Sequence, residues 1–309
     1  MKERIEHLFD SQLRDWEMAA KNYAALQEVR EKTFVISGNT IRVQFNPARL
    51  VSSAAKVDAK SIQARACFLC AENRPVEQTG IPFPAGYTIL INPFPIFPRH
   101  LTIPAVSHTP QRIAGRMQDM LAMAEALTDY VIFYNGPRCG ASAPDHIHFQ
   151  AGNKGFLPFE TAWRQHCLLL SDVKQGAIRE ISDNLRSGWI IEGNDKLHVC
   201  GLFEKVYNLL AKSPADDEPM MNLLAWFDDE KWTVVVFPRK KHRPACFSAQ
   251  GEGQLTISPA SVDLGGVFIT PLEKDFDRFT ADDIYGILHE VCLDQASLKD
   301  INNRLKERL

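Results

Sequence analysis

Two histidines separated by a single residue stand in the segment Asp145-His-Ile-His-Phe-Gln150. If this segment is a strand, His146, His148 and Gln150 point to the same face, because alternate strand residues share a face. A neutral imidazole can act as a nucleophile or bind a metal, and an amide can donate a hydrogen bond to an anion. Such a polar cluster is costly to bury without partners. From these residues alone, two histidines with no catalytic role are an equally good interpretation.

A second signal is the pair of cysteines in Cys67-Phe-Leu-Cys70. This spacing occurs in zinc half-sites and in redox pairs, and it also arises by coincidence. The redox interpretation fits poorly, because Asn73-Arg-Pro75 follows where a helix is needed. Zinc needs two more ligands, for which His108 and His146 are candidates, and a closed Cys2His2 set is structural. The spacing alone leaves these alternatives open.

A turn-rich loop, residues 135–144, precedes the histidines and contains Gly136, Gly140 and Ser142. Glycines in such a loop let backbone N–H groups approach an anion. On its own, however, the loop favours an ordinary turn over a phosphate site. The basic run from Arg239 to Arg243 likewise favours a solvated turn over a phosphate clamp.

The elements that position these residues alternate between strand and helix patterns, which predicts an α+β fold. Prolines interrupt residues 92–100, so neither a helix nor a central strand is expected there. Gly38-Asn39 is a hairpin signal between two strands. The predicted elements are helices over the first thirty residues and over 110–128, and strands over 33–37, 41–45, 87–91, 101–103, 129–134 and 145–150.

The second half of the chain repeats this theme weakly. Strand patterns recur at 222–227, 231–239 and 267–271, and Phe237-Pro-Arg-Lys-Lys-His242 echoes Phe97-Pro-Arg-His100. Two unrelated β-rich halves would give a similar pattern. We expect a helical extension over 1–32, a catalytic half over 33–170 and a related, degenerate half over 171–309.

Composition narrows the class of protein. The 309 residues are 45% hydrophobic and 24% charged, which excludes disorder as the default. The net charge of -3 gives no basic excess, so binding to nucleic acid is disfavoured. No apolar run approaches the ~18 residues that span a bilayer, and the N-terminus lacks the apolar core of a signal peptide. The odd number of seven cysteines favours a reducing, cytoplasmic location.

Together these motifs resemble the histidine-triad superfamily, in the branch of the galactose-1-phosphate uridylyltransferases and the diadenosine tetraphosphate phosphorylases, which are ATP adenylyltransferase-like. His146-Ile-His-Phe-Gln150 matches the His-x-His-x-Gln motif of that branch. The other segments that resemble family motifs are Cys67-Phe-Leu-Cys-Ala-Glu-Asn73, Ile91-Asn-Pro-Phe94, Ser107-His108, Phe133-Tyr-Asn-Gly136, Gly140-Ala-Ser142 and Gly155-Phe-Leu-Pro158. The resemblance implies two histidine-triad-like halves, each an antiparallel sheet with flanking helices, after an N-terminal helix.

The resemblance also implies an activity. The chain would be a nucleotidyltransferase or nucleotide phosphorylase that acts on a nucleoside diphosphate sugar or a dinucleoside polyphosphate. His148 would form a covalent nucleotidyl intermediate, and Gln150 would donate a hydrogen bond to a phosphate oxygen. A hydrolase that uses the same site, or a non-catalytic nucleotide sensor with a structural zinc, is the alternative. The acceptor, the base and the sugar stay open.

Nucleotide contacts and a metal site follow from the same resemblance. Cys67, Cys70, His108 and His146 would hold a structural Zn²⁺ that positions the loop beside the nucleophile. A homodimer is expected from the resemblance only. The residues implied to contact base, ribose or phosphates are Arg49, Asn92, Phe94, Asn135, Gly140 and Ser142.

Two positions depart from the family pattern. Asp145 lengthens the loop by one residue and is a candidate partner for His146 or His108. Pro93 replaces an Asp, which weakens the case for uridine. His100 lies in a proline-rich segment that resembles that of the diadenosine polyphosphate and GDP-sugar phosphorylases. Together, Pro93 and this segment slightly favour phosphorolysis and a purine nucleotide.

Overall fold

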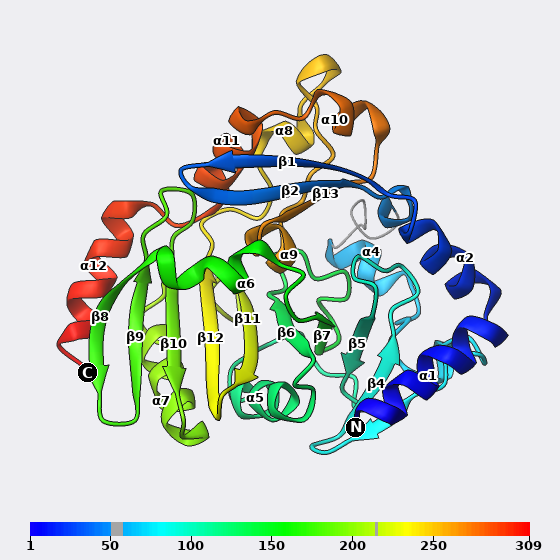
Figure 1. The fold of residues 1–309 in the computed structure, drawn as a ribbon, viewed down its shortest axis with the longest axis horizontal. Helices are drawn as coiled ribbons and strands as arrows, with labels where there is room; N and C mark the ends of the chain where they lie inside the picture. Colours follow the sequence, from blue (N-terminus) through cyan, green and yellow to red (C-terminus); the bar gives the residue numbers. More distant parts are fainter. Residues whose placement is uncertain (51–57, 214–215) are drawn as a thin grey trace.

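A continuous ten-stranded antiparallel sheet forms the centre of the computed structural model, which describes residues 1–50, 58–213 and 216–309 (Figure 1). The strands lie in the order β3-β4-β5-β7-β6-β11-β12-β10-β9-β8. Their bounds are β3 (Ile81–Phe83), β4 (Tyr87–Ile91), β5 (His100–Pro104), β6 (Tyr130–Asn135), β7 (His148–Asn153), β8 (Cys167–Val173), β9 (Gly176–Ile181), β10 (Trp189–Gly193), β11 (Met221–Asp228) and β12 (Lys231–Pro238).

Strands from the two halves of the chain meet in the middle of this sheet. β6 pairs with β11 in a register that sets Asn135 opposite Asn222 and Ile132 opposite Ala225. Five strands from earlier in the chain and five from later therefore form one sheet. The contact between β6 and β11 is called the seam. The α+β class predicted from the sequence is confirmed. The division into domains stays a prediction, and its boundary after residue 170 falls within β8.

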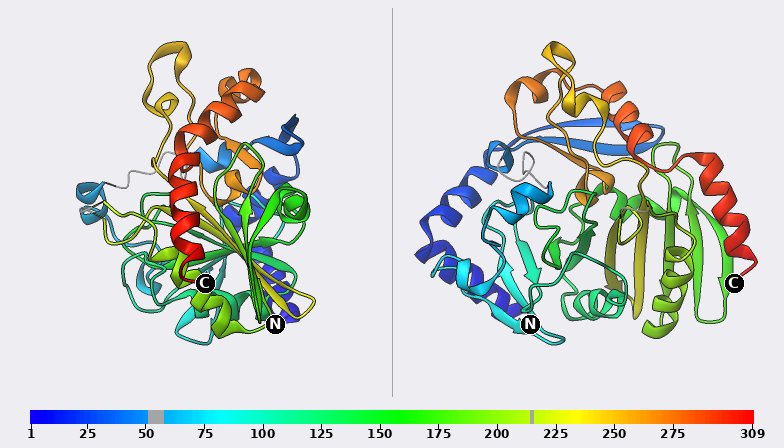
Figure 2. Two further views of the ribbon diagram at one scale, coloured as in Figure 1. Left: turned by 90° about the vertical axis from the view of Figure 1, so that its left-hand side faces the viewer. Right: turned by 180° about the vertical axis from the view of Figure 1, so that it is seen from behind.

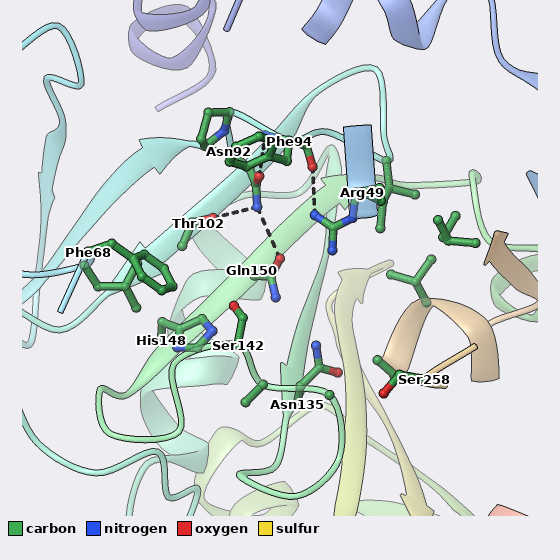
Figure 3. Close-up of a pocket in the computed structure, with 18 of the residues that line it drawn as sticks. Arg49, Phe68, Asn92, Phe94, Thr102, Asn135, Ser142, His148, Gln150 and Ser258 are labelled. Atoms are coloured by element: carbon green, nitrogen blue, oxygen red, sulfur yellow. Dashed lines mark hydrogen bonds between the residues drawn. The ribbon is translucent and has the colours of Figure 1, made fainter. Parts of the chain in front are cut away.

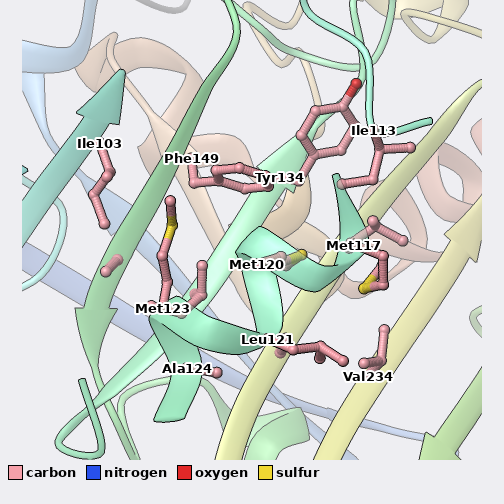
Figure 4. Packing of buried hydrophobic residues seen from close by; sticks show 14 of the residues in the cluster. Ile103, Ile113, Met117, Met120, Leu121, Met123, Ala124, Tyr134, Phe149 and Val234 are labelled. Carbon is pink, nitrogen blue, oxygen red and sulfur yellow. The ribbon is translucent and has the colours of Figure 1, made fainter. Parts of the chain in front are cut away.

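Side chains of the central strand β6 alternate between two cores, as the two-residue period of a strand requires. Ile132 and Tyr134 belong to one core, whereas Val131 and Phe133 belong to the other. Such an all-buried strand must be covered on both faces. On one face lies helix α5 (Met117–Ala126), whose Met120 and Leu121 are completely buried (Figure 4).

The core on the other side includes residues of a small second sheet, which lies across the upper ends of the central strands (Figure 1 and Figure 2). This sheet consists of β1 (Arg30–Ile36) and β2 (Asn39–Phe45), which form the predicted hairpin, and of β13 (Val267–Thr270), parallel to β2. The turn is Ser37-Gly38, one residue earlier than predicted. Both residues have positive φ, 50° and 78°, which suits the twist of a two-residue hairpin.

The sequence predicted two helices that the structure alters. The N-terminal helix is two, α1 (Lys2–Asp15) and α2 (Glu17–Leu26), because Trp16 between them is extended, with a φ of −118°. The helix expected over 110–128 begins only at Met117. Gly115, with a φ of +72°, stops any earlier start, because that backbone conformation cannot continue a right-handed helix.

Further helices and turns complete the fold. No helix among the described residues is long and apolar enough to cross a membrane. The remaining helices, short and long, are η1 (Pro47–Arg49), α4 (Ala59–Gln63), η2 (Ala71–Asn73), α6 (Pro158–Ala162), η3 (Trp163–Gln165), α7 (Lys196–Tyr207), α8 (Ala245–Ser248), η4 (Gly251–Gly253), α9 (Ser261–Leu264), α10 (Glu273–Arg278), α11 (Ala281–Val291) and α12 (Gln295–Lys306).

The four-residue echo between the halves is not a structural repeat. Phe97-Pro-Arg-His100 leads into β5, whereas Phe237-Pro-Arg239 ends β12. The two segments therefore occupy different positions relative to their strands. Whether a second copy of the chain joins the first stays a prediction.

Candidate active site

One cavity of about 590 Å³ gathers the residues that the sequence predicted for catalysis and nucleotide binding (Figure 3). It lies against β7, β5 and the end of β6, and the loop after β6 closes one side. The predicted residues that line it are Arg49, Asn92, Phe94, Asn135, Gly140, Ser142, His148 and Gln150. The chain thus brings together residues that are up to 101 positions apart in the sequence, 49 to 150.

His148, at the first position of β7, is held in one tautomer. Its Nδ1 lies 2.8 Å from the backbone oxygen of His146. A carbonyl only accepts, so Nδ1 carries the proton and Nε2 keeps a free lone pair. Burial lowers the pKa of His148 to about 4, so the ring is neutral at pH 7. This arrangement is what a nucleophilic imidazole needs.

The predicted strand over 145–150 begins three residues later than expected. His146 precedes β7 in a turn, so the alternation of a strand does not extend to it. His148 and Gln150 both line the cavity, whereas His146 turns towards the two cysteines. The prediction that the three side chains share one face was therefore wrong for His146.

Gln111, which the sequence did not single out, holds the backbone of His148. Its Oε1 accepts from the N–H of His148 at 2.8 Å. Its Nε2 donates to the carbonyl oxygens of His148 and Asn135, at 3.1 and 2.9 Å. Gln111 is completely buried, so it replaces strand-to-strand hydrogen bonds where β7 starts. Nothing in its sequence neighbourhood signals this role.

We expect Gln111→Leu to lower the free energy of unfolding by about 2 kcal/mol or more, because it leaves three buried backbone groups unpaired. Denaturant unfolding measures this loss. Gln165→Leu, at an exposed position, is the control for the change of residue type. Equal stability of the two variants would contradict the bridging role of Gln111.

Asn135 presents its amide to the cavity through contacts across the seam. Its Oδ1 accepts from Asn222 Nδ2 and from the backbone N–H of Ser261, both at 2.9 Å. The Nδ2 of Asn135 is therefore left to face the cavity as a donor. Arg239 in turn donates to Asn222 Oδ1 at 2.6 Å and is 5% exposed. The prediction that Arg239 belongs to a solvated turn was wrong.

Arg49, in η1, places a positively charged side chain at the wall of the cavity (Figure 3). One of its terminal nitrogens donates to the backbone oxygen of Phe94 at 2.8 Å, and its buried Nε has no hydrogen-bond partner among the described residues. Burial lowers the pKa of Arg49 to about 10, so it stays charged at neutral pH. A charged guanidinium with an unsatisfied N–H at a cavity wall is suited to bind an anion.

Gly140 lets the loop after β6 pass close to the second half of the chain. Its φ is +97°, and a Cβ built there would lie 2.6 Å from the Cβ of Ala260. Only glycine fits both restrictions. The loop then places Ser142 at the cavity wall, with its hydroxyl available to an anion.

The four predicted metal ligands form one cluster beside the cavity. One potential ligand atom from each of Cys67, Cys70, His108 and His146 lies within 4.8 Å of the other three. Cys67 Sγ lies 3.3 Å from His146 Nδ1, and Cys70 Sγ lies 3.1 Å from His108 Nδ1. Zinc bonds of ~2.0–2.3 Å give edges of about 3.3–3.8 Å in a tetrahedron. The thiol–imidazole distances of 3.1, 3.3 and 3.6 Å are close to these edges and suit a metal of this kind.

Neighbouring groups orient the candidate metal ligands. His146 Nε2 donates to the backbone oxygen of Ala105 at 2.8 Å, which leaves Nδ1 free to bind a metal. Asp145, the additional residue of the loop, lies with Oδ2 3.6 Å from His108 Nε2. Arg65 ties the two sites together, because it donates to Asp145 at 3.1 Å and to the backbone oxygen of Ser142 at 3.2 Å.

The sequence missed several wall residues. Trp16 lies between α1 and α2, and Met18 lies in α2. Phe68 lies between the two cysteines, with 46% of its surface exposed. An exposed aromatic side chain within a metal-binding spacing is the one signal that was available. From the second half, His242 and Ser258 also reach the cavity.

His100 is a further buried histidine beside the cavity. Burial, reinforced by the charge of Arg49, lowers the pKa of His100 to about 3. Unfolding exposes the ring, whose pKa then returns to ~6.5. The unfolded chain therefore binds one more proton than the folded chain between these values. Stability is complete above pH 6.5 and decreases as the pH falls towards 3.

We expect the unfolding free energy to lose about 1.4 kcal/mol per pH unit to His100 in the acid part of this range. In His100→Gln this contribution is absent, so the stabilities of wild type and variant converge as the pH falls from 6.5 to 4. Urea titrations at several pH values measure the difference. A difference independent of pH would show that His100 is not a buried neutral group.

Comparisons with known proteins agree with this geometry. Residues 8–153 match a family model described as a domain of unknown function (DUF4922), and residues 192–309 match one described as GDPGP1-like, C-terminal domain. None of the curated protein sequences matches significantly.

The fold is similar to crystal structures of the yeast Ap4A phosphorylase Apa2. The TM-scores are 0.62 for the protein alone, 0.59 for its complex with Ap4A and 0.54 for its complex with AMP. The sequences are 16%, 14% and 17% identical, and the matches cover 90%, 90% and 91% of this chain and 96% of the yeast chain. At this identity, the likeness establishes the fold.

Proposed function

We propose that this chain, whose fold is similar to that of the yeast Ap4A phosphorylase, is a histidine-triad protein of the branch that contains the Ap4A phosphorylases and acts as a nucleotidyltransferase or nucleotide phosphorylase. The proposal rests above all on the tautomer of His148, whose Nε2 lone pair is free beside the cavity. A covalent nucleotidyl-His148 intermediate follows from that nucleophile.

The first displacement forms a bond between His148 Nε2 and the α-phosphorus of a nucleotide donor. The bond from phosphorus to the bridging oxygen breaks, and the leaving group departs with the electron pair. The amide of Gln150 donates to the oxygen on which charge develops. In the second displacement an acceptor oxygen attacks the same phosphorus and restores the free imidazole.

Arg49, Asn135 and Ser142 would bind the phosphates, since they offer a guanidinium, an amide and a hydroxyl to one space. The apolar wall near Phe68 and Phe94 is suited to a base and ribose. A nucleoside diphosphate sugar and a dinucleoside polyphosphate both meet these requirements. The yeast phosphorylase of this fold was solved with Ap4A and with AMP, which supports including dinucleoside polyphosphates among the donors.

Zinc is the metal that we propose for the cluster of Cys67, Cys70, His108 and His146, because two thiols and two imidazoles favour it. A closed set of four protein ligands leaves no position for substrate, so its role is structural. It would hold the loop that carries Phe68 against the turn before His148.

Intact mass spectrometry tests the proposal. The protein is mixed separately with UDP-glucose, GDP-sugars, ATP and diadenosine tetraphosphate. We expect an acid-labile gain of one nucleoside monophosphate from at least one donor, and the mass of the gain identifies the base. Nucleotide binding without adduct or turnover from any donor would instead support a nucleotide sensor.

The acceptor is determined in the same assay. With inorganic phosphate or a sugar 1-phosphate present, a transferase or phosphorylase releases a nucleoside diphosphate or a nucleoside diphosphate sugar. A hydrolase releases the nucleoside monophosphate at the same rate with and without these acceptors. The second result would replace phosphorolysis by hydrolysis while leaving the covalent step in place.

A further inference from the structure

The proline-rich segment 92–100 contains two backbone N–H groups whose partners have consequences for Gln150. Prolines stand at 93 and 95 and have no N–H, so Phe94 and Ile96 supply the donors between them. The N–H of Phe94 donates to Asn92 Oδ1 at 2.9 Å, and the N–H of Ile96 donates to His100 Nδ1 at 3.1 Å. Each contact fixes one polar side chain in a single orientation.

For His100, the contact with Ile96 determines the tautomer. Nδ1 accepts a hydrogen bond, so the neutral ring carries its proton on Nε2. That nitrogen lies 3.0 Å from Gln150 Oε1. For Asn92, the contact with Phe94 leaves Nδ2 as the donor, and it lies 3.4 Å from the same oxygen of Gln150 (Figure 3).

Two donors therefore converge on one end of the Gln150 amide, and that end must be the oxygen. The Nε2 end, with its two N–H bonds, is left to face the cavity. In the opposite orientation the amide would present an oxygen to an anionic phosphate and would repel it. We propose that His100 is a positioning residue, which holds Gln150 with its N–H group towards the leaving oxygen of the nucleotide donor.

This inference rests on the proposed function for what Gln150 contacts, but the geometry has its own test. The ring of His100 is completely buried, and its Nε2 lies within hydrogen-bond distance of the Gln150 amide oxygen. In ¹⁵N NMR of the free protein we expect a neutral ring with the proton on Nε2. A proton on Nδ1 would overturn the proposal, whether or not the protein transfers nucleotides.

Kinetics test the consequence with a matched pair of variants. His100→Gln keeps a donor near the place of Nε2, whereas His100→Met has a similar length and no donor. With a donor whose leaving group is a phosphate or nucleotide, we expect His100→Met to slow nucleotidylation of His148 by about 10–100-fold. The KM should change little, and His100→Gln should recover most of the rate.

A donor with an activated leaving group separates positioning from damage to the fold. A 4-nitrophenyl nucleotide releases a weakly basic phenolate that needs little hydrogen bonding, so the loss in His100→Met should shrink to about 3-fold or less. Gln150→Ala should show the same dependence, and the double variant should be no slower than Gln150→Ala alone. The proposal would be overturned if His100→Met lost equal rates with both donors, or if the losses of the two single variants multiplied in the double variant. If wild type forms no adduct with any donor, the proposed function fails, and the NMR result alone then decides on His100.

Discussion

His148→Ala should form no nucleotidyl adduct and should lose turnover by on the order of 10⁴-fold or more, the size of effect seen when a covalent nucleophile is removed. Alanine leaves the backbone N–H of residue 148 with its partner Gln111 and removes only the imidazole. Intact mass and initial rates with the best donor are the measurements. Nucleotide binding should persist, because Arg49 and Asn135, which we propose to bind the phosphates, are unchanged.

The control for this variant is His7→Ala, at an exposed position of α1. It should label and turn over like the wild type. An adduct of the same mass in His148→Ala would place the nucleophile elsewhere and would refute the mechanism. Turnover without an adduct in the variant would show direct transfer to the acceptor.

Removal of the metal should have the second large effect. We expect about one zinc per chain in the purified protein, and its loss in Cys67→Ser should lower the melting temperature by roughly 10 °C. The physical reason is that the short loop around the cysteines has a very small apolar core of its own, formed by Cys67, Leu69, Cys70 and Ala143. Without metal, little else holds this loop in place.

Elemental analysis and thermal unfolding measure both quantities. Cys200→Ser, a thiol outside the cluster, should keep the metal and the melting temperature. Activity should fall in Cys67→Ser, because the loop contacts the turn before the nucleophile through His146. If the folded protein contains no zinc although it was prepared with zinc available, the metal assignment is overturned.

Several residues of the cavity and of the metal cluster could be predicted, because the motifs that contain them are local. His148 and Gln150 lie two positions apart, which is also their spacing in the family motif that they resemble. The two cysteines are likewise separated by only two residues. A local pattern of this kind survives in a sequence without knowledge of the fold, and the structure brings these residues together.

The supporting residues could not be predicted, because their roles depend on distant partners. Gln111 bonds the backbone at positions 135 and 148, and any residue type has a backbone there. Arg239 stands in a basic run that looks solvated, and only the fold shows that Asn222 and neighbouring carbonyls surround it. The break at Trp16 has the same origin, since helix periodicity continues across it.

The seam has a consequence for how such a chain can change over time. The donor face of Asn135 belongs to the first half, but Asn222, Ser261 and Arg239 of the second half determine it. A substitution on one side leaves a buried polar group unpaired unless the other side changes with it. The half without the proposed nucleophile is therefore constrained: across descendants, these four positions should be replaced together or kept together, however far the rest of the second half diverges.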